Sequence, residues 1–207
     1  MLIDTHCHLD GTNCKEGADA ALVRARSAGV GAFVAIGVGS LVAAREVLAL
    51  SERHADVSCT VGVHPHDATT LDDELYTELA ALAANPLVVA IGEIGLDYHY
   101  DHSPRDAQAE AFRRFIALAR KVQKPIVVHT RSAAADTLSV LETEGASDVG
   151  GVIHCFSEDR AFARRAFDLG FDVSFSGIVT FKNATSIHDV ASFAPDERFL
   201  VETDSPY

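Results

Sequence analysis

Two histidines one residue apart follow a short apolar run at the start of the chain, in the segment LIDTHCH at 2–8. Side chains alternate between the two faces of a strand, so we expect His6 and His8 to point to one side and Cys7 to the other. Two converging imidazoles are half of the ligands of a tetrahedral metal site. Because such a pair also arises by chance, its weight depends on the rest of the chain.

Four further metal-binding side chains each come directly after a short apolar run. They are Glu93 after 87–92, His129 after 125–128, His154 after 151–153, and Asp204 after 199–203. Runs of this kind, bounded by glycine, proline or charged residues, are typical of strands buried on both faces. One such residue is more often a cap or a surface group. Four in succession, all with nitrogen or oxygen donors, predict a single metal site.

Strands and helices alternate about eight times along the chain. Helical periodicity follows 16–28, 41–54, 71–82, the segment after Ser103-Pro104, and the segments that end at Gly145, Gly170 and Phe193. This alternation predicts an α/β TIM barrel in one domain over residues 1–207, with an open doubly wound sheet as the alternative. We prefer the barrel because the carboxyl ends of all its strands meet at one mouth. The chain ends three residues after Asp204, so the barrel is expected to lack its last helix.

Two local expectations concern the middle of the chain. The strand before Glu93 is expected to end there, with a loop over 95–101. Ser103 is expected to cap the following helix, with Pro104 in its first position.

The composition is that of a folded chain with one sizeable core, since 48% of the 207 residues are hydrophobic and 23% are charged. There is no run of about 18 apolar residues, so no membrane span is predicted. The N-terminus lacks the basic segment of a signal peptide. The four cysteines show no Cys-x-x-Cys spacing, which favours a reducing compartment. We therefore expect a cytoplasmic protein.

The net charge is −13, from 17 Lys and Arg against 30 Asp and Glu. This balance disfavours a broad basic face for gripping duplex nucleic acid. It does not exclude nucleic acid as a substrate, because a pair of metal ions supplies local positive charge whatever the net balance.

Seven segments in the right order resemble the TatD family of metal-dependent deoxyribonucleases, within the amidohydrolase-like metal barrels. They are IDTHCHLD at 3–10, GVHPH at 62–66, AIGEIGLDY at 90–98, HTR at 129–131, HCFS at 154–157, SGIVTFKN at 176–183 and ETDSPY at 202–207. The resemblance extends from Met1 to Tyr207. The family continues past this point with a basic loop and a last helix, whose absence bears on substrate grip and stability rather than on the metal ligands.

The resemblance implies two divalent metal ions at the barrel mouth. One would be held by His6, His8, Glu93 and Asp204, and the other by Glu93, His129 and His154, with Glu93 as the bridge. These ligand types suit Mg, Mn, Zn, Co or Fe and do not choose among them. Two ions about 3.5–4 Å apart clamp phosphate oxygens and lower the pKa of bridging water, which is what hydrolysis of an anionic phosphodiester needs.

Two carboxylates near the end of the chain are candidate catalytic groups. Asp204 can reach bound water and is the candidate general base. Glu202 shares its side of the strand and is either a second catalytic group or a residue that orients a ligand. Glu93 completes the catalytic set as the bridge between the ions.

Three basic side chains are candidates for substrate binding. His64, which is also a candidate catalytic residue, either donates a hydrogen bond to a phosphate or is an ordinary loop histidine. Arg131 either binds phosphate in bidentate fashion or pairs with Asp97 or Asp136. Lys182 either contacts the nucleic-acid backbone or is simply solvated.

Aromatic residues and local departures from the family complete the pattern. Tyr100 and Phe156 either stack on bases or pack inside the protein. The segment 11–14 lacks the aromatic residue usual in the family, and Ser132 and Ala134 replace a more polar pair. Asp97 and Tyr98 are expected to shape the loop after the fourth strand.

Three functions are compatible with these residues. The first is a deoxyribonuclease acting on single-stranded DNA or on ends, as an exonuclease. The second is a metal-dependent ester or amide hydrolase such as a D-aminoacyl-tRNA deacylase. The third is a non-catalytic nucleic-acid-binding relative, which the complete ligand set disfavours. Base-stacking aromatics at a basic rim favour the first function, and a small pocket for an amino-acid side chain favours the second.

Overall fold

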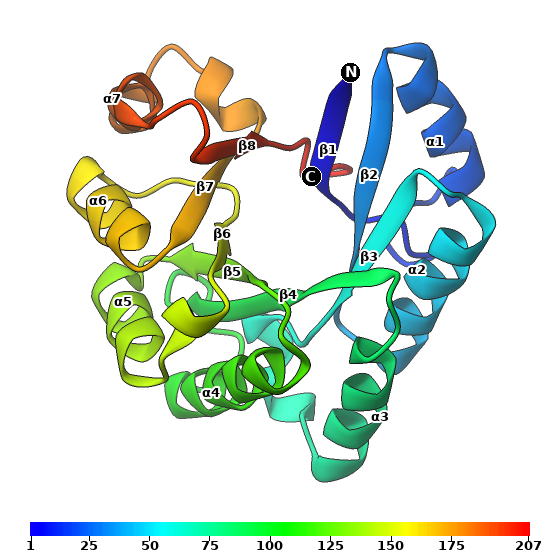
Figure 1. The fold of residues 1–207 in the computed structure, drawn as a ribbon, viewed down its shortest axis with the longest axis horizontal. Coiled ribbons are helices and arrows are strands. Elements are labelled where there is room, and N and C mark those ends of the chain that lie inside the picture. The colour runs from blue at the N-terminus through cyan, green and yellow to red at the C-terminus, as the bar shows by residue number, and fades with distance from the viewer.

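Eight parallel strands alternate with helices in the computed structural model, which describes residues 1–207 (Figure 1). The strands are β1 (Leu2–Cys7), β2 (Val30–Gly37), β3 (Val57–Val61), β4 (Val88–Asp97), β5 (Ile126–Arg131), β6 (Gly151–Ile153), β7 (Phe171–Phe175) and β8 (Phe199–Val201). The helices are α1 (Ala18–Ser27), α2 (Leu41–Arg53), α3 (Asp73–Ala83), α4 (Arg105–Val122), α5 (Ala134–Thr143), α6 (Arg160–Asp168) and α7 (Thr185–Phe193). Each strand pairs with the next in one sheet, so the predicted barrel is confirmed.

Apolar side chains of the strands and of the inner helix faces form one core cluster of 39 buried residues. Helix α4 illustrates the pattern, because Phe112, Phe115 and Ile116 recur at helical spacing and are 1% exposed or less. None of the four cysteines is in a disulfide. No helix has the length and apolar character needed to cross a membrane.

The sheet curls until β8 lies beside β1, and the two are joined only at their carboxyl ends. Cys7 and Ser205 form an isolated parallel bridge, and the His8 N–H donates to the Ser205 carbonyl at 2.8 Å. Asp4 reinforces this junction by accepting hydrogen bonds from the Thr203 N–H at 3.0 Å and the Thr203 hydroxyl at 2.6 Å. The barrel is therefore tied together at the end where the candidate ligands lie.

Strand β4 continues to Asp97, so the loop expected over 95–101 begins later than predicted. Gly95 makes this continuation possible. Its φ is 141°, and a Cβ at this position would lie 2.0 Å from the His129 carbonyl oxygen. With no Cβ at Gly95, β4 can run close alongside β5 beyond Glu93 as far as Asp97.

Ser103 does not cap α4, which begins at Arg105 after Pro104 with no side-chain cap. The Ser103 hydroxyl donates instead to the His66 carbonyl oxygen at 2.7 Å and accepts from the Thr69 N–H at 3.3 Å. The predicted cap was wrong because these partners lie in the 3₁₀ helix Pro65–Thr70, which the sequence pattern did not indicate.

Candidate metal centre

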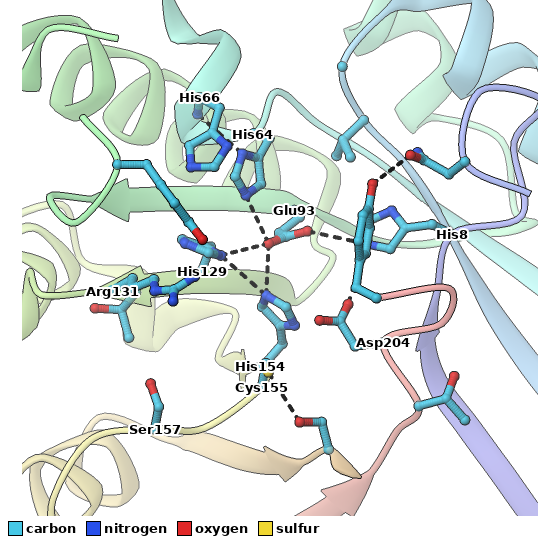
Figure 2. A pocket seen from close by; sticks show the side chains of 18 of the residues that line it. His8, His64, His66, Glu93, His129, Arg131, His154, Cys155, Ser157 and Asp204 are labelled. Carbon is cyan, nitrogen blue, oxygen red and sulfur yellow. Dashed lines mark hydrogen bonds and ion pairs between the residues drawn. The ribbon is translucent and has the colours of Figure 1, made fainter. Parts of the chain in front are cut away.

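The carboxyl ends of five strands bring the six predicted ligands into one cluster at the barrel mouth. Glu93 lies at its middle and is 2% exposed. Figure 2 shows imidazoles converging on this carboxylate from several sides. Five histidines place a ring nitrogen within 4.0 Å of its oxygens: His6, His8, His64, His129 and His154.

One half of the cluster has the spacing of ligands around a single ion. The His6 and His8 Nε2 atoms are 3.3 Å apart, and they lie 3.6 and 3.5 Å from Asp204 Oδ1. Glu93 Oε2 is 3.4 Å from His6 Nε2 and 4.0 Å from His8 Nε2. A tetrahedral ion with bonds of about 2.0–2.2 Å places its ligands about 3.3–3.6 Å from one another. These four side chains therefore fit one divalent cation.

The other half surrounds the second oxygen of Glu93. His154 Nε2 lies 2.7 Å, His129 Nδ1 2.9 Å and His64 Nε2 3.3 Å from Glu93 Oε1. His129 Nδ1 and His154 Nε2 are 3.5 Å apart. The donors match a second cation in type, and the shorter contacts are hydrogen bonds that a cation would replace. His64 belongs to this group, although the sequence indicated a contact with phosphate, a catalytic role or a loop position for it and not a place among the metal-binding donors.

The electrostatics of the cluster are dominated by Glu93. Burial alone would raise the pKa of its carboxyl, but the His154 and His64 imidazoles hold that pKa well below the usual range. Burial would lower the pKa of His154, yet the Glu93 and Glu202 carboxylates raise it well above its ordinary value. A protonated imidazole cannot bind a cation, so metal binding at His154 competes with a proton and metal affinity rises with pH.

Asp204 follows the end of β8 and has a left-handed backbone conformation with φ of 54°. Aspartate tolerates this region better than most residues do. Its side chain is 22% exposed, whereas that of Glu93 is 3% exposed, so Asp204 is the carboxylate of the cluster that faces solvent. Burial would raise the pKa of Asp204, but hydrogen bonding with His8 and the charge of His154 lower it.

Glu202 lies behind the cluster and does not face the mouth. Its Oε1 accepts the Cys155 N–H at 2.7 Å and is 3.4 Å from His154 Nδ1, the ring nitrogen that points away from Glu93. The rings of His6 and His154 are stacked at 3.9 Å, and their ligand atoms form a group with Glu202 within 4.8 Å. Glu202 is therefore placed to orient the imidazoles of His6 and His154.

Asp97 is a second outer carboxylate, for which the sequence indicated a part in shaping a loop or in pairing with Arg131. Its Oδ2 lies 3.1 Å from His129 Nε2 and 2.9 Å from His66 Nε2. Its Oδ1 accepts the N–H groups of His99 at 3.0 Å and Tyr100 at 2.9 Å. One signal was available, because residues four apart in a strand share a face and Asp97 is four residues after Glu93.

A cavity of about 1420 Å³ opens above the cluster. Arg131 lines it, pairs with neither Asp97 nor Asp136, and places its guanidinium carbon 4.7 Å from the centre of the Tyr100 ring. Lys182 does not line it. Phe156 is 2% exposed and packs against Phe162 and Phe175, so it belongs to the core.

A parallel (β/α) barrel with histidines and carboxylates gathered at the carboxyl ends of its strands defines the metal-dependent hydrolase class. The family model described as TatD related DNase matches residues 3–207, and the chain belongs to this family. It is a TatD-family metal-dependent hydrolase.

Relatives and solved structures agree with this family. The chain is 43% identical over 210 residues to the uncharacterized metal-dependent hydrolase YcfH of Escherichia coli strain K12, covering 100% of this chain and 78% of that protein. It is 32% identical over 207 residues to the 3'-5' ssDNA/RNA exonuclease TatD of Citrobacter koseri, covering 100% and 79%. The crystal structure of the TatD homolog YJJV from Escherichia coli K12 superposes with a TM-score of 0.90 at 31% identity, covering 99% of this chain and 79% of that one.

Proposed function

We propose that this chain hydrolyses phosphodiester bonds of DNA, as an exonuclease on single strands or ends, with two divalent cations. The observation that carries the proposal is the pair of donor groups that share Glu93 beneath an open cavity. His6, His8, Glu93 and Asp204 would hold one cation, and Glu93, His129 and His154 the other. The named activity of the Citrobacter koseri relative supports nucleic acid as the substrate class.

The chemistry divides between the cations and the chain. When bound, the cations would offset the phosphodiester charge and make water more acidic. Asp204, at the solvent side of the cluster, would take the proton from the attacking water through a carboxylate oxygen. His64 would help to hold the phosphate at the Glu93 Oε1 side of the site. Glu202 would orient His154 from behind.

The cavity favours nucleic acid over an aminoacyl ester. Its volume of about 1420 Å³ exceeds the 300–1,000 Å³ typical of small-molecule pockets. Half-exposed or exposed rings line it, with Tyr100 at 49% and Phe181 at 59% exposure. Aromatic faces of this kind stack on unpaired bases.

The test is metal reconstitution followed by a substrate panel. The protein is stripped with EDTA, and Mg²⁺, Mn²⁺, Zn²⁺ or Co²⁺ is added back singly. Each sample is given end-labelled single-stranded DNA, the matching duplex, RNA of the same sequence, and a D-aminoacyl-tRNA. We expect stepwise shortening of single-stranded DNA with at least one metal and none in Glu93→Ala. Release of the amino acid with all nucleic acids intact would overturn the proposal in favour of an ester hydrolase.

A further inference from the structure

A pair of stacked aromatic rings, those of Tyr100 and His102, lies on one side of the cavity, next to the donor group of His129. We call this pair the plate. The rings of Tyr100 and His102 are parallel within 3° with centres 5.6 Å apart. Tyr100 is 49% exposed, and both residues line the cavity. His66 stands at 90° to the Tyr100 ring with centres 5.5 Å apart. The two rings are stacked on one another, and the part of the Tyr100 ring that stays exposed offers a flat surface against which another flat ring can pack.

Hydrogen bonds and an ion pair hold the loop that carries the plate. Asp97 accepts the Tyr100 N–H at 2.9 Å, and Arg105 pairs with Asp101 at 3.0 and 2.8 Å on the next turn of the loop. Through its other oxygen Asp97 contacts His66 and His129. One buried carboxylate therefore fixes both the plate and a candidate metal ligand, so the spacing between them is set before any substrate arrives.

A single cation lies against the plate, because the guanidinium carbon of Arg131 is 4.7 Å from the centre of the Tyr100 ring. Arg131 is the only lysine or arginine that lines the cavity, and its guanidinium has no carboxylate partner. Figure 2 places it beside His129, on the opposite side of Glu93 from His8 and Asp204. An unpaired guanidinium presents a planar fork of donors that matches a phosphate group. The net charge of the chain is −13, so a guanidinium without a carboxylate partner beside the candidate metal centre is an unusual feature.

We propose that Tyr100, His102 and Arg131 form a nucleotide subsite, with a base stacked on the part of the Tyr100 ring that His102 and Arg131 leave exposed and the adjoining phosphate on the guanidinium. This inference rests on the proposed function and adds to it the means of recognising the substrate. A base inside a duplex is already stacked on both faces, so only an unpaired nucleotide can use the plate. The subsite therefore accounts for a preference for single strands without a basic face.

The first experiment tests whether the ring acts on a base. Thymidine tetranucleotides are prepared intact and with one abasic residue at each position in turn, and kcat/KM is measured for wild type, Tyr100→Ala and Tyr100→Phe. Loss of one stacked base is expected to cost about 5- to 150-fold. We expect this loss in kcat/KM for Tyr100→Ala on the intact strand. On the strand that lacks the base meeting the plate, we expect Tyr100→Ala and wild type to have the same kcat/KM. Tyr100→Phe is expected to keep near-wild-type rates.

A matched control comes from the same protein. Arg114 stacks on Tyr76 at 4.4 Å outside the cavity, as Arg131 stacks on Tyr100. Arg131→Gln is expected to lower kcat/KM at least 5-fold on the intact strand, and methylphosphonate replacement of one neighbouring linkage is expected to abolish the difference. Arg114→Gln is expected to leave both rates unchanged. Equal losses for Tyr100→Ala on intact and abasic strands, or no loss on either, would overturn the subsite.

Binding separates the subsite from the proposed activity. Calorimetric titration with the intact tetranucleotide, in EDTA and again with Mn²⁺, measures affinity without relying on turnover. If no metal supports hydrolysis but binding weakens 5-fold or more in Tyr100→Ala, the hydrolase proposal fails and the subsite stands. If wild type hydrolyses the strand and Tyr100→Ala binds and hydrolyses it equally well, the subsite fails alone.

Discussion

Asp97 Oδ2 lies 3.1 Å from His129 Nε2, on the side of the imidazole opposite Glu93. Burial would raise the pKa of Asp97, but hydrogen bonds from His129, the Tyr100 N–H and His66 hold it well below the usual range. The Asp97 carboxylate is therefore placed to accept a hydrogen bond from His129 Nε2. A ring that donates through Nε2 has Nδ1 free to bind a cation.

Replacing Asp97 with asparagine should weaken metal binding more than it weakens the chemistry. The uncharged amide cannot hold the His129 ring as firmly, and loss of such an outer partner typically costs 10- to 100-fold in metal affinity. Chelator competition measures this affinity for Asp97→Asn and for the control Asp136→Asn, whose carboxylate accepts the Tyr98 hydroxyl at 2.9 Å. Wild-type affinity in Asp97→Asn would remove Asp97 from the metal centre.

Replacing Glu202 with glutamine tests whether this carboxylate only orients His154 or takes part in the chemistry. Glu202→Gln keeps an oxygen for the Cys155 N–H but removes the charge behind His154. If Glu202 only orients, metal affinity should fall about 10- to 100-fold and excess metal should restore kcat. Activity that stays low at saturating metal, with unchanged affinity, would instead give Glu202 a part in the chemistry.

The clustering of the candidate ligands was predictable because strands obey period two and barrels gather their strand ends. His6, Glu93, His129 and Asp204 required nothing beyond apolar runs and the residue after each. Asp97 was harder to interpret, because its role depends on β4 continuing past Glu93, which the close approach at Gly95 permits. The plate of Tyr100 and His102 depends on how the loop after β4 folds back over His66, and no local pattern encodes that contact.

Glu93→Gln tests the bridge between the two donor groups. The amide keeps the shape of the side chain but loses the charge that offsets two dications, so we expect both metals to be retained poorly and turnover to fall by orders of magnitude. Metal content per chain, from elemental analysis after gel filtration, is measured alongside kcat. Near-normal turnover with two metals per chain would show that Glu93 is not the bridge.

The acid dependence of stability can be tested away from the metal centre. The bidentate hydrogen bonds from Arg26 to Asp56, at 2.7 Å each, lower the pKa of the Asp56 carboxyl. Because the folded pKa lies below the unfolded one, this pair stabilises the fold fully above pH about 4 and loses its effect as pH falls through the folded pKa. The half-exposed setting limits the effect to about 1 kcal/mol or less.

The measurement compares the free energy of unfolding of wild type and Asp56→Asn by urea titration in EDTA, at pH 7 and at pH 3. We expect wild type to be more stable at pH 7 and the two proteins to converge at pH 3. A difference that is the same at both pH values would mean that Asp56 acts through packing rather than charge.

Asp204→Asn separates a general base from a mere ligand. The amide can still offer an oxygen to a cation but cannot take a proton. We therefore expect modestly lower metal occupancy, turnover reduced about 100-fold or more, and a flatter acidic limb of the pH–rate profile. Saturating metal is the deciding control. If excess metal returns Asp204→Asn to the wild-type rate, Asp204 serves only as a ligand, and the base must be sought among the other groups that face the cavity.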